Sequence, residues 1–171
     1  IASITSVTEH DTVPIRDALQ RILVETIISP INVPPYANSA MDGYAIRSAD
    51  LPATGTTSLK LIGTSWAGRP FHGSVGTQEC IRIMTGAKMP TGADTIIMQE
   101  HVQATNESIT IGTGHQSGQH LRHAGDDIQQ GSTVLVAGKK IGPAEIGLLA
   151  SLGISHIKVS RRARVAFFST G

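Results

Sequence analysis

The stretch INVPPYANSAMDGY, residues 31–44, is the most constrained part of the chain. Pro34 and Pro35 each fix φ and lack a backbone N–H, so neither fits inside a helix or a central strand. The Asn, Ser, Asp and Gly residues that follow supply turn chemistry. We therefore expect a stiff, irregular loop that presents the carboxylate of Asp42. Such residues also form plain connectors between strands, but a locked loop on a rigid scaffold is a common place for function.

Composition limits the class of protein to which this loop belongs. The chain has 171 residues, of which 40% are hydrophobic and only 4% aromatic, so its cores must consist mainly of Ile, Val, Leu and Ala. The formal net charge of +1 argues against a nucleic-acid partner. Cys80 is the only cysteine, which excludes an internal disulfide framework and suits a reducing cytosol. Since there is neither a signal pattern nor an apolar run of roughly 20 residues, we expect a cytoplasmic protein with no membrane partner.

The two ends of the chain have mixed helical and strand character. A helical spacing of apolar residues predicts a short helix over residues 14–21, followed by a strand over 22–29. Gly142 and Pro143 open the clearest helix, and Gly153 ends it. Further strands are predicted near the C-terminus at residues 134–136, 154–159 and 165–168.

The middle of the chain contains short apolar runs separated by glycine, proline and polar clusters. This pattern is typical of an all-β sandwich or barrel. The predicted strands cover residues 44–47, 59–63, 80–84, 95–100 and 108–111.

Together these patterns predict an α+β fold with an inserted all-β domain. Domain I is predicted to be discontinuous, with residues 1–43 and 132–160, and the β-rich domain II to cover 44–131. The strand at 165–168 has the composition of a buried parallel strand, yet almost no chain follows it. We therefore expect residues 161–171 to be the opening strand of a truncated α/β third domain.

Two further polar clusters have residue types suited to anions. RIMTGA, residues 82–87, ends a strand in a glycine turn, where the Thr85 hydroxyl and nearby N–H groups can meet an anion. RHAGDD, residues 122–127, combines a guanidinium suited to phosphate with carboxylates suited to Mg²⁺. The plainer interpretations are an ordinary strand–turn and a solvated charged turn. We assign no chemistry to Asp94, and the seven histidines show no regular metal spacing.

Several ordered blocks resemble the molybdopterin molybdenumtransferase family, which includes the gephyrin E domain. They are NSAMDGY at 38–44, RIMTGA at 82–87, GAD at 92–94, MQE at 98–100, GDDI at 125–128, PAEIGLLASLG at 143–153 and VAFFSTG at 165–171. One departure is Gln20, which stands where the family often has glycine, so the local turn there is in doubt.

The resemblance implies a reaction, the insertion of molybdate into the dithiolene of adenylylated molybdopterin with release of AMP. A divalent metal, taken as Mg²⁺, assists it. The family's fold is an elongated homodimer of four-domain subunits, in which this chain corresponds to the discontinuous first domain, the inserted β domain and the first strand of the pterin-binding domain. The implied partners are a second copy of the parent chain, molybdate, adenylylated molybdopterin and the enzyme that adenylylates it.

Matched position by position, the resemblance also implies the site residues. The catalytic residues would be Asp42, Thr85, Arg122 and Asp127, and the metal would be held by Asp42 and Asp127. The cofactor-binding residues would be Ser39, Gly43 and Arg122.

Two other functions stay open. One is a non-catalytic binding or scaffolding module of the gephyrin type, and the other is a free-standing metal phosphoesterase that uses Asp42 and Asp127. Under the main hypothesis this chain alone holds only half of a site, because the pterin-binding domain lies beyond Gly171. We therefore expect the chain by itself to be inactive.

Overall fold

The computed structural model describes residues 7–169 and 171. Within these residues it is mostly β, with short strands and a single α-helix. The prediction of an α+β fold is therefore correct only in part. Among the described helices, none has both the length and the apolar character needed to cross a membrane.

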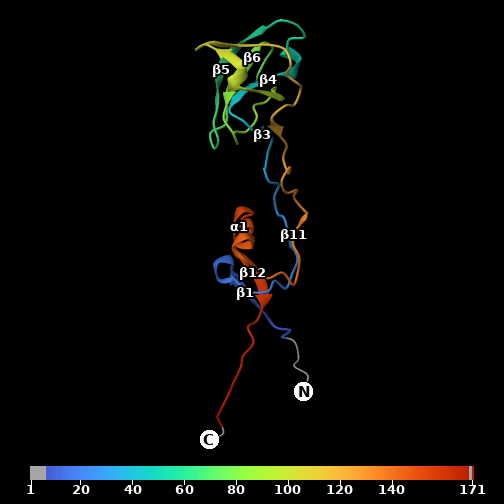
Figure 1. The fold of residues 1–171 in the computed structure, drawn as a ribbon, viewed down its shortest axis with the longest axis vertical. Helices are drawn as coiled ribbons and strands as arrows, with labels where there is room; N and C mark the ends of the chain where they lie inside the picture. The colour runs from blue at the N-terminus through green and yellow to red at the C-terminus, as the bar shows by residue number, and fades with distance from the viewer. Residues whose placement is uncertain (1–6, 170) are drawn as a thin grey trace. The chain divides into compact units, whose positions relative to one another are not determined.

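The chain divides into two compact units. Unit 2 is Asn32–Gln129, and unit 1 consists of the described residues on either side of it. Figure 1 shows the two segments of unit 1 in blue and in orange to red, at the two ends of the colour scale. The sequence prediction places the inserted domain at residues 44–131. Residues 32–43 go with unit 2 because they form backbone pairs with residues in the range 121–128.

Unit 1 combines two short antiparallel strand pairs with the α-helix. β1 pairs with β12 and β2 with β11, so each pair joins the first segment of the unit to the second. The elements are β1 (His10–Pro14), the 3-10 turn η1 (Ile15–Asp17), β2 (Ile27–Ile28), β11 (Thr133–Leu135), α1 (Pro143–Ser151) and β12 (His156–Ser160).

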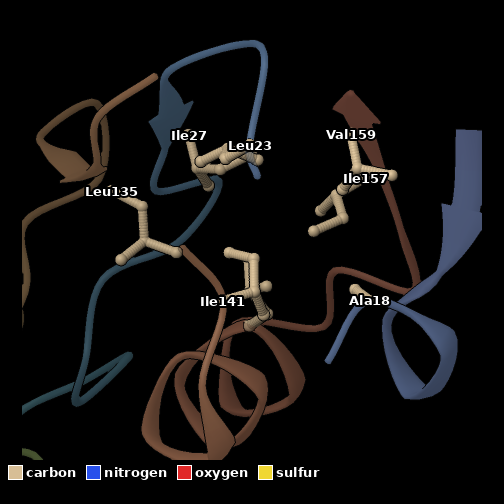
Figure 2. Packing of buried hydrophobic residues seen from close by; sticks show 8 residues of the cluster. Ala18, Leu23, Ile27, Leu135, Ile141, Ile157 and Val159 are labelled. Carbon is tan, nitrogen blue, oxygen red and sulfur yellow. The ribbon is translucent and has the colours of Figure 1, made fainter. Parts of the chain in front are cut away.

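Figure 2 shows the apolar core of unit 1, to which both segments contribute. Ala18 and Leu23 come from the first segment, and Ile141, Leu149 and Val159 from the second. All of them are almost fully buried. Neither segment has enough apolar side chains to form this core without the other, so unit 1 needs both.

The helix α1 begins and ends as the sequence predicts. Pro143 occupies its first position, where a missing N–H costs nothing. The Glu145 carboxylate accepts the backbone N–H of Gly142 at 2.9 Å and so satisfies one of the free donors at the helix start. Gly153 follows the last turn with a left-handed φ of 73°, as is common after a helix.

The predictions for residues 14–29 are wrong in both elements. Only Ile15–Asp17 form a helical turn, because Gln20 has a left-handed φ of 63° that a right-handed helix cannot accommodate. The predicted strand shortens to β2, since the N–H of Leu23 bonds Lys139 while that of Val24 bonds Lys158, so no continuous ladder forms.

The predicted strand at residues 165–168 does not form, since 161–169 include no strand. Val165, Phe167 and Phe168 are 82%, 94% and 87% exposed. Apolar residues of this kind form a strand when a neighbouring strand supplies hydrogen bonds and cover. The described residues offer this segment neither, so the predicted third-domain strand is absent from the structure.

Unit 2 is built on a six-stranded sheet in the order β7-β4-β6-β5-β9-β8, in which only the β5–β6 pair is parallel. Outside it, β3 (Asn38–Ser39) pairs with β10 (Leu121–Arg122). The sheet strands are β4 (Gly43–Ile46), β5 (Thr57–Ser65), β6 (Glu79–Ile83), β7 (Thr95–Met98), β8 (Val102–Ala104) and β9 (Ser108–Ile111).

Both faces of this sheet are covered by apolar residues. Tyr44 and Ile46 of β4 belong to one buried cluster, whereas Ala45 belongs to a second. Side chains alternate between the two faces of a strand, so the two clusters lie on opposite faces. The five strands predicted for the middle of the chain are confirmed to within a few residues. The short strands β3, β8 and β10 were missed.

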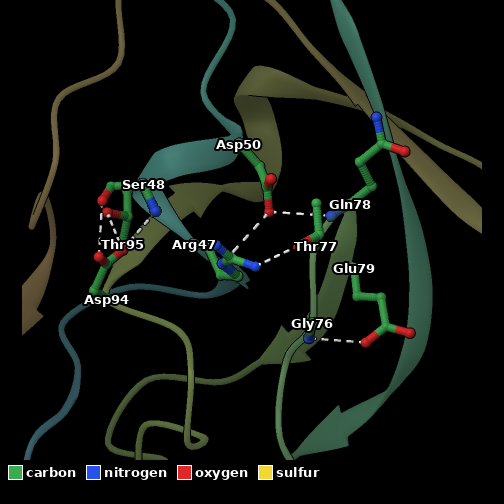
Figure 3. A network of polar contacts seen from close by, with 9 residues as sticks. All are labelled: Arg47, Ser48, Asp50, Gly76, Thr77, Gln78, Glu79, Asp94 and Thr95. Atoms are coloured by element: carbon green, nitrogen blue, oxygen red, sulfur yellow. Dashed lines mark hydrogen bonds and ion pairs between the residues drawn. The ribbon is translucent and has the colours of Figure 1, made fainter.

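A network of polar contacts fixes the loops at one end of the sheet, as Figure 3 shows. The 3-10 turn η2 (Ser48–Asp50) follows β4 at this end, whereas the 3-10 turn η3 (Gln99–His101) follows β7 at the other end of the sheet. The Asp94 carboxylate accepts the Ser48 N–H at 2.6 Å and the Ser48 hydroxyl at 2.7 Å. The carboxylate of Asp50 accepts the Gln78 N–H at 3.1 Å. These bonds give Asp94 a structural role, and the assignment of no chemistry to it stays a prediction.

Candidate functional site

The loop at residues 31–44, here called the signature loop, is held from two sides within unit 2. On one side, Ser39 exchanges backbone hydrogen bonds with Gly86 and Ala87, at 2.8 and 3.1 Å. On the other, the Ala40 N–H donates to the carbonyl of His120 at 2.9 Å. These bonds place the loop beside the RIMTGA turn and beside the chain that leads into β10.

Asp42 and Thr85 meet across this junction. The backbone N–H and the hydroxyl of Thr85 both donate to Oδ1 of Asp42, at 2.7 and 2.8 Å. The backbone bond from Thr85 is the main cause that lowers the pKa of Asp42, and the Thr85 hydroxyl and the charge of Arg82 lower this pKa further. Asp42 is therefore an oriented, ionised carboxylate at the surface. In the described part of the chain, Oδ2 of Asp42 has no hydrogen-bond donor.

Arg122 and Asp127 form a second charged pair. A guanidinium nitrogen of Arg122 lies 2.6 Å from Oδ1 of Asp127, and their side chains are 37% and 55% exposed. The hydrogen bond to Asp127 raises the pKa of Arg122, and the charge of Asp127 adds to this. Arg122 also pairs with Asn38 in the β10–β3 ladder, so this strand pair brings the charged turn alongside the signature loop.

The charged turn is fastened to the proline-rich start of the signature loop as well. The backbone N–H groups of Asp127 and Gly125 donate to the carbonyls of Val33 and Pro34, at 2.9 and 3.0 Å. Asp126 uses its carboxylate within the turn, where Oδ2 accepts the N–H of His123 at 2.7 Å. Asp127 is therefore the carboxylate of this turn that faces Arg122, and Asp126 holds the turn together.

Ser39 and Gly43, expected to contact a cofactor, have clear structural roles. Ser39 is 1% exposed, and its hydroxyl donates to the carbonyl of Met41 at 2.5 Å. A Cβ at Gly43 would lie 2.1 Å from the carbonyl oxygen of Ile97, so only glycine fits at this close approach of two strands. Cofactor contacts by these two residues stay a prediction.

Three residues of this region were missed by the sequence predictions. Arg82 lies over the ring of Tyr44, with 4.9 Å from its guanidinium carbon to the ring centroid, and also donates to Gln99. Oδ1 of Asn38 is buried without a partner. His120, whose carbonyl holds the signature loop, has a left-handed φ of 58°, which is strained for a non-glycine residue. Arg82 and Asn38 gave a sequence signal, as parts of the RIMTGA and NSAMDGY blocks, whereas His120 gave none.

The described residues contain no group of three or more His, Cys, Asp or Glu side chains placed to hold a metal ion. Asp42 and Asp127 offer carboxylate oxygens of the kind that Mg²⁺ prefers. Mg²⁺ sites commonly use one or two carboxylates together with substrate phosphates and water. A metal site shared by these two residues stays a prediction.

The fold and the site define a protein in which a β-rich unit interrupts a discontinuous unit and presents a fixed surface carboxylate. Residues 1–153 match the family model described as the MoeA N-terminal region (domain I and II). The chain belongs to the MoeA family and corresponds to its N-terminal region.

Curated relatives carry names consistent with this family. The chain is 42% identical over 165 residues to a molybdopterin molybdenumtransferase of Haemophilus influenzae. The aligned region covers 96% of this chain and 40% of that protein. It is 37% identical over 179 residues to gephyrin of Dictyostelium discoideum, covering 95% of this chain and 24% of that protein. The chain thus spans less than half the length of these relatives.

A solved structure agrees with the fold. The crystal structure of the molybdopterin biosynthesis moeA protein from Pyrococcus horikoshii OT3 matches with a TM-score of 0.85 and 32% identity. The match covers 89% of this chain and 41% of that one.

Proposed function

We propose that this chain is part of a molybdopterin molybdenumtransferase that inserts molybdate into the dithiolene of adenylylated molybdopterin and releases AMP. The family and the names of the relatives support a role in molybdenum cofactor biosynthesis. The observation that carries the finer proposal is the contact between Asp42 and Thr85, because it fixes one ionised carboxylate on a stiff loop. Such preorganisation lowers the reorganisation needed during a reaction.

The charges of the site suit the proposed substrates. Molybdate and the phosphoanhydride of the adenylylated pterin are both anions, and cations must offset their mutual repulsion. Arg122 contributes one of its guanidinium nitrogens to Asp127, and its planar group has further N–H donors for phosphate or molybdate oxygens. The pairing with Asp127 therefore holds the arginine in place while leaving donors for an anion.

Asp42 and Asp127 would hold Mg²⁺ together with phosphate oxygens of the substrate. When bound, the ion would supply positive charge to the leaving phosphate group. Thr85 would keep Asp42 ionised and in one orientation, since both of its donors stabilise the charged carboxylate.

The chain spans 40% of the Haemophilus relative, and we propose that the rest of the parent protein supplies the pterin-binding residues. The parent would act in the cytoplasm as a homodimer, in which these residues come from the partner subunit. It would receive its substrate from the enzyme that adenylylates molybdopterin.

The deciding experiment compares the full-length parent with this chain in molybdenum insertion. Adenylylated molybdopterin, molybdate and Mg²⁺ are supplied, and both AMP release and cofactor formation are measured. The parent should turn over and the chain alone should not, because the chain carries only part of the proposed site. Turnover by this chain at the parent's rate would overturn the division of the site, and an inactive parent would overturn the proposed function.

A further inference from the structure

Three histidines that the proposed function does not use gather in a cleft of unit 2. This cleft, here called the His cleft, has a volume of about 500 Å³ and is lined by His101, residues 112–115, Gln119 and His120. Small-molecule sites typically have volumes of roughly 300–1,000 Å³. Among the described residues, no Asp, Glu, Lys or Arg lines it. Its chemistry therefore depends on imidazole rings, the Gln119 amide and backbone groups.

The imidazole rings of the His cleft lie close together. The ring centroids of His101 and His115 are 6.0 Å apart, with their planes inclined at 33°. Burial is the main cause that lowers the pKa of His115, and the charges of His101 and His120 lower this pKa further. The pKa of His115 is thus below its ordinary value of 6.5, so its ring is mainly neutral at pH 7.

Gln119 decides which nitrogen of the neutral His115 ring carries the proton. The Gln119 carboxamide has one orientation, because its Oε1 accepts the N–H of Gln116 at 3.0 Å and its Nε2 donates to the carbonyl of Ile96 at 3.2 Å. This Nε2 also lies 3.1 Å from Nδ1 of His115. An amide nitrogen only donates hydrogen bonds, so Nδ1 is the acceptor. The proton of His115 is therefore on Nε2, which becomes a donor for a ligand.

This arrangement disfavours a metal ion as the ligand. A metal binds a histidine through the lone pair of one ring nitrogen, while the other nitrogen keeps its proton and donates it. In His115 the lone pair of Nδ1 faces Gln119, and Nε2 carries the proton. The part of the chain that the structure describes also has no group of three or more His, Cys, Asp or Glu side chains placed to hold a metal. A cleft with N–H donors and no carboxylate suits an anion instead.

The backbone adds further donors at the same cleft. Within the described residues, the N–H groups of Thr113, Gly114 and His115 form no hydrogen bond with a backbone carbonyl. Successive free N–H groups can form anion-binding concavities. His101 is exposed, so its ring can turn towards a ligand. Hydrogen bonds of about 2.8 Å from both rings can then reach one small anion.

We propose that the His cleft binds a small tetrahedral oxyanion of the sulfate or phosphate type. His115 would donate through Nε2, His101 through its ring N–H, and the turn at residues 113–115 through its backbone. This inference goes beyond the proposed function, because none of the residues proposed to act on the substrate or the metal lines the His cleft. It does not depend on molybdenum insertion.

The test is a titration of this chain with sulfate and, separately, with inorganic phosphate, followed by backbone amide NMR and calorimetry. Chloride keeps the ionic strength constant, and the buffer contains no other oxyanion. Each anion should saturate one site and shift the amides of residues 112–115 and 119–120. The anion that binds more tightly identifies the class of the natural ligand.

Variants of the histidines show whether the rings hold the anion. His115→Phe keeps a ring but removes its donor, and it should raise the Kd about tenfold through loss of one hydrogen bond to a charged group. His115→Gln restores an N–H donor and should recover part of the binding. His101→Phe alters an exposed side chain and should also raise the Kd. The matched control is His10→Phe, at an exposed histidine of β1 in unit 1, which should leave the Kd unchanged.

Absence of saturable binding of both anions would overturn the inference, and so would equal losses in the His115 and His10 variants. Zn²⁺ is titrated alone as the alternative ligand. Saturable Zn²⁺ binding that His115→Phe abolishes would show a metal site and would also overturn the inference. Thermal midpoints show whether each variant folds, and if His115→Phe is unfolded, the exposed His101→Phe decides the outcome.

Discussion

Asp42 and Asp94 of unit 2 accept hydrogen bonds of the same kind but use them differently. Each carboxylate receives the backbone N–H and the hydroxyl of one Thr or Ser residue, at 2.6–2.8 Å. In Asp42 both bonds from Thr85 go to Oδ1. In Asp94 the bonds from Ser48 are divided between Oδ1 and Oδ2, and the Thr95 hydroxyl adds another at 3.0 Å.

The comparison shows that a hydrogen-bonding pattern alone does not identify a functional carboxylate. Asp94 uses both oxygens to fasten η2 to the start of β7, so little of its bonding capacity is left for a ligand. Asp42 uses one oxygen to hold its orientation, and its second oxygen has no hydrogen-bond donor among the described residues. Each variant below alters the charge or the hydrogen bonds of one of these carboxylates and leaves the other carboxylate unchanged as the reference.

The largest effect is expected for Asp42→Asn in the full-length parent. Asparagine can keep both Thr85 bonds on its single oxygen, so the thermal midpoint should stay close to that of the wild type. The lost charge should lower molybdenum insertion by about two to three orders of magnitude. Thermal midpoint and cofactor formation are measured on the same preparation. Unchanged turnover, or a loss of stability that matches the loss of activity, would remove Asp42 from the site.

A smaller effect is expected when only the Thr85 hydroxyl is removed. Thr85→Val preserves the shape of the side chain and the backbone N–H, but it deletes one of the two donors to Asp42. Insertion by the parent should fall roughly tenfold, because one hydrogen bond to a charged group is lost. Thr85→Ser keeps the hydroxyl and serves as the control. Equal activities of the Val and Ser variants would show that the hydroxyl does not position Asp42.

Asp94→Asn should show the opposite pattern to Asp42→Asn. Asparagine has one acceptor oxygen, so it cannot receive the two Ser48 bonds on separate oxygens as aspartate does. We expect a loss of about 1 kcal/mol in the free energy of unfolding, or a thermal midpoint lower by about 2–4 °C. Insertion per folded molecule should be unchanged. A specific loss of activity without destabilisation would mean that Asp94 belongs to the site.

The smallest effects concern pH. Burial raises the pKa of Asp94, but hydrogen bonds from Ser48 and Thr95 outweigh it and lower this pKa below the ordinary value of 3.8. A carboxylate with a lowered folded-state pKa adds stability above its unfolded pKa, and this stability is lost as pH falls through the folded pKa. The difference in unfolding free energy between wild type and Asp94→Asn should therefore be complete at pH 7 and shrink below about pH 4.

Urea unfolding at a series of pH values measures this difference. A difference in unfolding free energy that persists at acid pH would contradict the role given to the Asp94 hydrogen bonds.

The pKa of Asp42 gives a related prediction, since this pKa is also lowered, chiefly by the backbone hydrogen bond from Thr85. Carboxyl NMR titration should show that Thr85→Val raises the pKa of Asp42 and leaves that of Asp94 in place.

Much of the fold follows from local sequence. Pro143 and Gly153 mark the ends of α1 without reference to anything else in the chain, because they act through their own backbone. The strands of the sheet in unit 2 follow from apolar runs between turn residues. Residues 14–21 show where such patterns fail, since a helical spacing of apolar side chains was overruled by the left-handed Gln20 and by packing against the second segment.

The sequence by itself determined which residues have the chemistry of the candidate site. Loop stiffness, charge and the family blocks each depend on short, continuous stretches of sequence. It determined the carboxylate of Asp42 and the combination of Arg122 with acidic residues. Only the tertiary structure decided that Thr85 holds Asp42 and that β10 brings Arg122 alongside the signature loop. These contacts join residues far apart in the chain, and their formation depends on strand pairing that no local pattern specifies. For the same reason, tertiary structure alone distinguished the two carboxylates, leaving one oxygen of Asp42 available and engaging both oxygens of Asp94.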